Sequence, residues 1–168
     1  MRVVDSFAQR VQRLRDHREA DQHYSGKKAH TVKTQVVVTL GNRDVRRVTL
    51  GVPGPVADPM LVRQSGVLAR ATPDDPLIGD QAYRAVDNVV TPRRKPRGQE
   101  RLPEDVAFNR AFARARIIVD HSIRDLRQFQ ALTRPDRHRR GQEPRVCAVV
   151  ERRARRCRPG RRDRRLAA

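Results

Sequence analysis

The stretch TVKTQVVVT at residues 31–39 is the part of the sequence that decides the fold. Valine and threonine make up most of it, and β-branched side chains favour an extended strand. A Gly-Asn turn signal follows at residues 41–42, and a second β-rich run, VRRVTLGV, occupies residues 45–52. A Pro-Gly-Pro break at residues 53–55 ends this run. We therefore predict an antiparallel hairpin over residues 31–52.

Three shorter apolar runs outside the hairpin predict further strands, and two of them lead to an acidic residue. The pair at residues 3–4 ends at Asp5, and the pair at residues 77–78 leads to Asp80. A third pair at residues 89–90 is closed by a proline. Short apolar runs bounded by turn residues are typical of short buried strands. This interpretation places two carboxylates at strand ends.

The clearest helix is predicted over residues 103–132. Apolar side chains recur there at intervals of three and four residues, which form one stripe along a helix. The stripe consists of Phe108, Phe112, Ala115, Val119, Ile123, Leu126 and Phe129. Pro103, followed by two acidic residues, suits a first helical turn, and Pro135 ends the pattern. One continuous helix and two helices separated by a kink both fit this spacing.

The remaining segments are predicted from their composition. Residues 13–29 are polar and charged and are expected to form a loop. Residues 58–70 are expected to form a short helix, and Asp58 is expected to be its N-cap rather than a metal ligand. The Arg-rich residues 141–168 have almost nothing to bury, so we expect a disordered basic tail behind a single domain at residues 1–140.

The net charge is the strongest compositional signal, because 38 Lys and Arg against 19 Asp and Glu give a formal +19 in 168 residues. A field of this sign attracts polyanions, of which nucleic acid is the most common. GC-rich coding DNA would also produce much of the arginine excess, so charge alone does not identify a DNA-binding function. No apolar run reaches the length of a membrane span and no signal-peptide segment is present, so we expect a cytoplasmic protein associated with the nucleoid.

Three acidic residues stand where a two-metal site would require them. Asp5 and Asp80 follow predicted strands, and Asp120 lies on the predicted long helix. Two divalent ions about 4 Å apart need oxygen ligands that converge from separate elements. Carboxylates at strand ends are common, so this pattern gains weight only from the sequence around each acid.

The segments around these acids form a series of motifs. They are VDSFAQ at residues 4–9, YSGKKAHTVKTQ at 24–35, Pro53-Gly54 with Asp58, GDQAY at 79–83, KPRG at 95–98, and Asn109 with RIIVDHSI at 116–123. These motifs resemble those of the DDE-superfamily transposases of insertion sequences, and they occur in the order of that family. The resemblance covers roughly residues 3–140 of the chain.

This resemblance implies an α/β fold of the ribonuclease-H-like kind, with a mixed sheet flanked by helices, and metal-dependent DNA strand cleavage and transfer. Asp5, Asp80 and Asp120 correspond to the three acids that bind two Mg²⁺ or Mn²⁺ ions. The basic residues expected to hold DNA phosphates are Lys27, Lys28, His30, Lys33, Lys95 and Arg97. Members of the family generally act as multimers on paired DNA ends, so a homo-oligomer on DNA is a further expectation.

The sequence departs from the family pattern in ways that bear on activity. Asp120 replaces the usual glutamate, and Ala57 and Ala82 replace the usual histidine and glycine. The chain starts four residues before Asp5, so we expect the family's N-terminal DNA-binding region to be absent. The Arg-rich tail is what a shifted reading frame would produce. An active transposase domain, an inactive relic and a non-catalytic basic DNA-binding protein therefore stay open.

Overall fold

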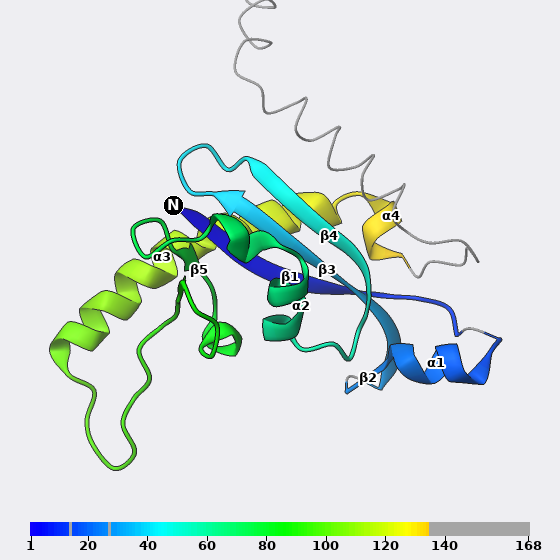
Figure 1. The fold of residues 1–168 in the computed structure, drawn as a ribbon, viewed down its shortest axis with the longest axis horizontal. Helices are drawn as coiled ribbons and strands as arrows, with labels where there is room; N and C mark the ends of the chain where they lie inside the picture. Colours follow the sequence, from blue (N-terminus) through cyan, green and yellow to red (C-terminus); the bar gives the residue numbers. More distant parts are fainter. Residues whose placement is uncertain (14, 27, 135–168) are drawn as a thin grey trace, which may run out of the picture.

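The predicted hairpin forms the centre of the fold (Figure 1). β3, Ala29–Thr39, pairs antiparallel with β4, Val45–Pro53, so this prediction is confirmed. β1, Arg2–Arg10, pairs antiparallel with the other edge of β3. The structure is a computed structural model that describes residues 1–13, 15–26 and 28–134.

Shorter strands extend the sheet beyond these three. β5, Leu77–Ile78, pairs in parallel with β1, and β6, Val89–Val90, pairs in parallel with β5, as the two apolar pairs predicted. β2, Tyr24–Ser25, pairs antiparallel with the start of β3. The described residues therefore form a six-stranded mixed sheet in which β4, β3, β1, β5 and β6 follow one another.

A long helix covers one face of the sheet. α3, Pro103–Arg127, packs its apolar stripe against side chains of β1 and β3 that point to this face. Their common core consists of Val3, Phe7, Val36, Val38, Ile78, Phe112, Val119, Ile123, Leu126 and Leu132. The helix ends before residues 128–129, and α4, Gln130–Thr133, follows, so the predicted segment contains two helices. The stripe itself lies in α3 as far as Leu126, and Phe129 is the N-cap of α4.

Short helical segments cover the opposite face of the sheet. They are α2 at Asp58–Gln64 and two 3-10 turns, η1 at Val67–Arg70 and η2 at Gln81–Tyr83. Their core consists of Val4, Val37, Val62, Val67, Ala71, Leu77, Tyr83 and Val86. The single helix predicted over residues 58–70 is wrong, because Gly66 adopts a φ of +67° and separates α2 from η1.

The predicted end of the first strand is also wrong. Asp5 lies in the middle of β1 rather than at its end, because the ladder between β1 and β3 continues as far as the pair Arg10–Thr31. Each residue added to this ladder satisfies further backbone hydrogen-bonding groups. The paired strand therefore continues through a polar stretch in which only every second side chain faces α3.

The predicted loop over residues 13–29 contains regular structure. α1, His17–His23, and the short strand β2 both lie within it. Ala20 of α1 is buried, and its carbonyl accepts a hydrogen bond from His30 Nδ1 at 2.9 Å. The burial of Ala20 and this side-chain contact help to anchor a helix whose sequence is almost entirely polar.

Two of the predictions concern the C-terminal part of the chain. The Arg-rich tail at residues 141–168, with its expected disorder, lies outside the described residues. The predicted domain boundary at residue 140 lies outside them as well. Within the described ranges, no helix is both long enough and apolar enough to cross a membrane.

Candidate metal and DNA site

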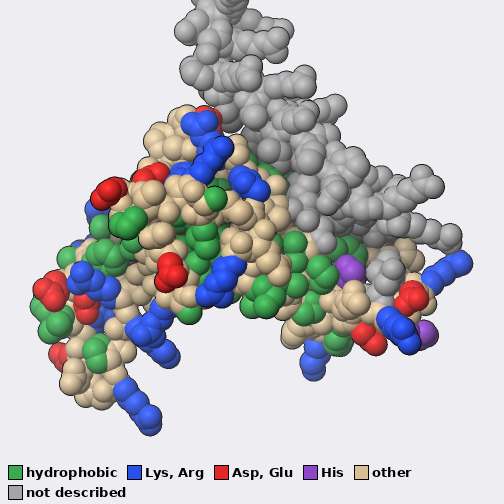
Figure 2. All heavy atoms as spheres, viewed as in Figure 1, with side chains coloured by type: hydrophobic (Ala, Val, Ile, Leu, Met, Phe, Trp, Pro, Cys, Tyr) green, Lys and Arg blue, Asp and Glu red, His purple; other side chains and the backbone are tan. Residues whose placement is uncertain are grey.

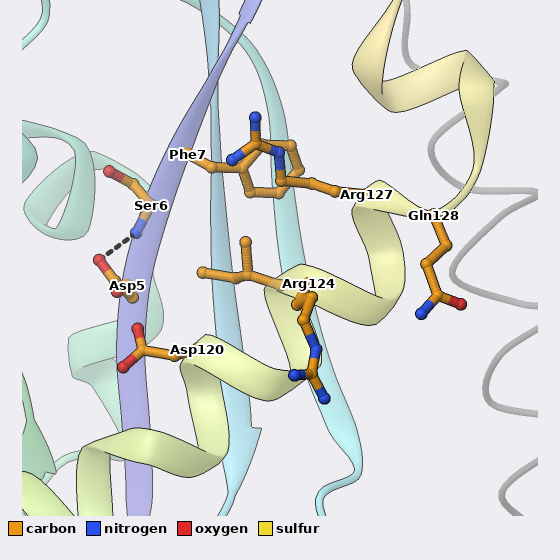
Figure 3. A pocket seen from close by; sticks show the side chains of 8 residues that line it. Asp5, Ser6, Phe7, Asp120, Arg124, Arg127 and Gln128 are labelled. Atoms are coloured by element: carbon orange, nitrogen blue, oxygen red, sulfur yellow. Dashed lines mark hydrogen bonds between the residues drawn. The ribbon is translucent and has the colours of Figure 1, made fainter.

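Asp5 and Asp120 face each other in a pocket between β1 and α3 (Figure 3). The pocket has a volume of about 570 Å³. Its walls are formed by Asp5, Ser6, Phe7, Asp120, Ile123, Arg124, Arg127 and Gln128. Two carboxylates and two guanidinium groups therefore share one hollow beside the central strand.

The apolar stripe of α3 explains why Asp120 reaches this pocket. Val119 on the stripe is fully buried, and each further helical residue turns by about 100°. Asp120 therefore leaves the core at the border of the buried face and is exposed. On the strand side, Val36, the ladder partner of Asp5, is buried in the core beneath α3. The Asp5 side chain consequently starts from the face of the sheet that α3 covers.

The Asp5 carboxyl group has a raised pKa. Burial is the main cause, and the negative charges of Asp80 and Asp120 raise the pKa further. The Ser6 backbone N–H donates to Oδ1 at 2.8 Å and Arg116 donates to Oδ2 at 3.2 Å, and both contacts lower the pKa in part. The charges of the other two predicted acids thus reach Asp5.

Asp80 has a different local role from the other two acids. It follows β5 and caps the η2 turn, where its Oδ1 accepts a hydrogen bond from the Ala82 backbone N–H at 2.9 Å. It does not line the pocket that Asp5 and Asp120 share. Among the described residues, no three His, Cys, Asp or Glu side chains are grouped in a way that could hold a metal ion. The structure therefore brings two predicted acids into one pocket, whereas Asp80 acts on Asp5 only through its charge.

Gly79 determines how the chain turns from β5 into Asp80. A Cβ atom at residue 79 would lie 2.8 Å from Cδ2 of Tyr83 and 2.9 Å from Cγ1 of Val89. The buried Tyr83 ring therefore packs directly on the Gly79 backbone. Any larger residue would displace either the ring or the adjacent strand, which gives the Gly-Asp pair of this motif a structural reason.

Four of the predicted phosphate-binding residues are exposed or lie outside the described ranges. Lys28 is exposed next to β2, and Lys95 and Arg97 are exposed in the loop between β6 and α3. Figure 2 shows basic side chains projecting from this loop at the lower left of the molecule. Lys27 lies outside the described residues. The exposed members are accessible to a polyanion.

The other two predicted phosphate-binding residues make contacts within the protein. The Lys33 ammonium group lies 3.0 Å from Asp58 Oδ1 and donates to the Val56 carbonyl at 2.6 Å. His30 is bonded through Nδ1 to the Ala20 carbonyl. Both side chains therefore support local structure, whatever they contribute to DNA binding.

Asp58 has a contact that sequence reasoning missed. The prediction that it caps α2 is wrong, because Ala57 occupies the N-cap position and no side chain caps the helix. Asp58 instead accepts a hydrogen bond from Ser6 Oγ at 2.7 Å and pairs with Lys33. No local pattern indicates this contact, because Ser6 and Asp58 are 52 positions apart.

Three arginines of the site were also missed, although their spacing carries a signal. Arg116 bonds to Asp5, and Arg124 and Arg127 line the pocket. Residues 116, 120, 124 and 127 are separated by three or four positions, so they share one face of a helix. The prediction used only the apolar stripe on the neighbouring face, so this row of charged side chains was not included.

The chain belongs to the DDE superfamily of endonucleases. The family described as DDE superfamily endonuclease matches residues 4–154, which confirms the resemblance carried by the motifs. The chain is also similar to a probable transposase for insertion sequence element IS702 from Microchaete diplosiphon, with 32% identity over 124 residues. The match covers 70% of this chain and 44% of that relative, so the chain spans less than half of the relative's length. No solved structure matches the chain.

Proposed function

We propose that this chain is the catalytic domain of a transposase-type endonuclease, which cleaves and transfers DNA strands with the help of divalent metal ions. The observation that carries the proposal is the apposition of Asp5 and Asp120 in one pocket of a DDE-superfamily chain. The negative charge of Asp80 raises the pKa of Asp5, which supports Asp80 as the third acid. DNA is then the substrate, and the nucleoid is the place of action.

The arrangement of the sheet supports the ribonuclease-H-like fold that the motifs imply. β1 lies between an antiparallel neighbour and a parallel neighbour and carries Asp5. Asp80 follows the parallel neighbour, and Asp120 belongs to the helix that covers the sheet. In the proposed site, three elements far apart in the sequence each contribute one acid.

The side chains of the pocket fit a hard divalent cation. Carboxylate oxygens are the ligands that Mg²⁺ and Mn²⁺ prefer. The pKa of Asp5 is raised by burial and by the negative charges of Asp80 and Asp120, and a bound cation would offset this electrostatic repulsion. Asp5, Asp120 and Asp80 would hold the ions. When bound, the ions would activate a water or a DNA 3′-hydroxyl and stabilise the negative charge that develops at the phosphate.

The arginines of the pocket would bind the DNA backbone. Arg124 and Arg127 line the pocket on the same helix as Asp120. A guanidinium group can donate two parallel hydrogen bonds to one phosphate, which fixes its orientation as well as its position. Exposed Lys95 and Arg97 would add contacts that carry no sequence information.

A non-catalytic DNA-binding protein is the second candidate, and particular observations favour it. Arg116 already pairs with Asp5, and the described residues contain no group of three metal-ligating side chains. Asp120 is also one methylene shorter than the glutamate expected from the motif. The formal charge of +19 would support DNA binding without any chemistry.

Metal dependence separates the two candidates. We expect the purified chain to nick supercoiled plasmid DNA in Mn²⁺ or Mg²⁺ and to stop when the ions are chelated, with Asp5→Asn as the inactive control. A protein that only binds DNA would bind the plasmid equally well with and without chelator and would leave it supercoiled. That second result would overturn the nuclease proposal.

A further inference from the structure

Ser6, Lys33 and Asp58 form a polar cluster on the face of the sheet that α2 covers. Asp58, the first residue of α2, accepts a hydrogen bond from Ser6 Oγ at 2.7 Å, and its Oδ1 lies 3.0 Å from Lys33 Nζ. Lys33 also donates to the Val56 carbonyl at 2.6 Å. One carboxylate thus ties α2 to two adjacent strands, β1 and β3.

The surroundings of this cluster are largely buried. The Lys33 and Asp58 side chains are 15% and 25% exposed, and Gln35, the ladder partner of Ser6, is 1% exposed. The pKa of the buried Tyr83 hydroxyl is raised, first by burial and then by the charge of Asp58. An ion pair in such surroundings loses much of its hydration and is weak evidence for stability by itself. A gain in stability therefore does not by itself explain the Lys33–Asp58 ion pair.

Ser6 connects the cluster to the pocket on the other face. Its backbone N–H donates to Asp5 Oδ1 at 2.8 Å, while its hydroxyl donates to Asp58. Successive residues of a strand point to opposite faces, so Asp5 and Ser6 project towards α3 and α2 respectively. Figure 3 shows the Ser6 side chain turned away from α3, with its N–H bonded to the Asp5 carboxylate. The peptide group between Asp5 and Ser6 donates its N–H to the Asp5 carboxylate. Asp58 fixes this peptide group through the Ser6 hydroxyl, from the opposite face of the sheet.

We propose that Asp58 is a positioning residue for the metal site, which acts through the Ser6 hydroxyl to fix the peptide group that orients the Asp5 carboxylate. This inference rests on the proposed function, in which Asp5 binds the metal. Lys33 holds the Asp58 carboxylate in place from β3. Hydrogen-bonded partners behind a metal-binding side chain set its orientation, and their loss typically weakens metal binding about 10- to 100-fold.

Mn²⁺ binding, measured by isothermal titration calorimetry on the full chain, tests this role without requiring catalysis. Ser6→Ala removes only the hydroxyl that links β1 to Asp58, and Ser6→Thr keeps it. We expect Ser6→Ala and Asp58→Ala to weaken Mn²⁺ binding about tenfold or more, and Ser6→Thr to bind close to the wild type. Ser65→Ala is the matched control, because the buried Ser65 hydroxyl donates to the Val62 carbonyl at 3.0 Å and lies outside the pocket.

The outcomes separate failure of this role from failure of the proposed function. If Asp5→Asn weakens Mn²⁺ binding while Ser6→Ala and Asp58→Ala bind like the wild type, the positioning role is overturned and the metal site stands. If Asp5→Asn itself binds Mn²⁺ like the wild type, the metal site is wrong, and the positioning role with it. A loss in Ser65→Ala as large as that in Ser6→Ala also overturns the role. Should Asp58→Ala not fold, Ser6→Ala decides, because it leaves the Lys33–Asp58 pair intact.

Discussion

The Arg116 guanidinium group lies 3.2 Å from Oδ2 of Asp5, and Arg116 precedes Asp120 by one turn of α3. The two side chains are 24% and 17% exposed, so water screens their attraction only in part. Asp5, which lines the pocket, is therefore already paired with a cation that the protein itself supplies. Any divalent ion that binds Asp5 has to compete with this contact.

Replacing Arg116 is therefore expected to strengthen metal binding. We predict that Arg116→Gln binds Mn²⁺ at least roughly fivefold more tightly, because two unit charges about 4 Å apart interact by about 1 kcal/mol even at the dielectric constant of water. Calorimetric titration at neutral pH measures the change, with Arg110→Gln, an exposed position of the same helix, as the control. Weaker binding in Arg116→Gln would mean that Arg116 orients Asp5 rather than competing for it.

The raised pKa of Asp5 makes the ionised residue destabilising at neutral pH. The folded protein binds the Asp5 proton more tightly than the unfolded chain, where the pKa is near 3.8, so its contribution to stability falls as the pH rises from 3.8 through the raised value. We expect Asp5→Asn to melt at a higher temperature than the wild type at about pH 7, with a difference that shrinks towards about pH 4. Thermal unfolding followed by circular dichroism measures both. A difference that does not vary with pH would contradict this electrostatic assignment.

Local patterns predicted the elements whose partners are close in the sequence. The hairpin of residues 31–52 and the stripe over residues 103–132 each carry their own periodicity, and both are present in the structure. The continuation of β1 to Arg10 depends on pairing with β3, which no pattern within residues 2–10 reveals. α1 was missed because its burial rests on Ala20 in an otherwise polar segment.

In the candidate site, too, the position of a residue could be predicted only where a local pattern indicates it. Val119 belongs to the predicted stripe, so helical geometry places Asp120 at the border of the buried face, and in the structure Asp120 is exposed and lines the pocket. Local rules assigned Asp58 to a helix cap, whereas its actual partner, Ser6, belongs to a strand 52 positions away. Contacts across that distance follow from the packing of α2 on the sheet, so only the tertiary structure reveals them.

Gly54 allows the end of β4 to lie closely against β3. A Cβ atom there would overlap Thr31 Oγ1 and would lie 2.8 Å from the Thr31 carbonyl oxygen. We expect Gly54→Ala to lower the free energy of unfolding by about 1–3 kcal/mol, the usual cost of overpacking. Urea unfolding measures the loss, and Gly41→Ala, whose Cβ would meet nothing within 4 Å, is the matched control. Equal stability of the two variants would show that Thr31 and Gly54 are not in such close contact.

DNA binding by this chain is expected to be non-specific and strongly dependent on salt. With several phosphate contacts, affinity should fall by roughly 10³ between about 50 and 200 mM salt, because each contact releases counterions. Gel-shift titrations over this range give the slope, and Lys95→Gln or Arg97→Gln should each reduce it by about one. A sequence-selective complex that tolerates salt would refute this expectation.

Nicking of supercoiled plasmid in Mn²⁺ by the wild type, Asp120→Glu and Asp120→Ala tests the central claim most directly, namely that Asp120 and Asp5 act as one metal site. The aspartate at residue 120 is one methylene shorter than the glutamate expected from the motif, so Asp120→Glu should extend the carboxylate into the pocket towards Asp5. We predict that Asp120→Glu nicks faster than the wild type, that Asp120→Ala does not nick, and that all three bind DNA with similar affinity. Equal nicking by all three would contradict the claim, because Asp120 would then be only a surface acid of α3.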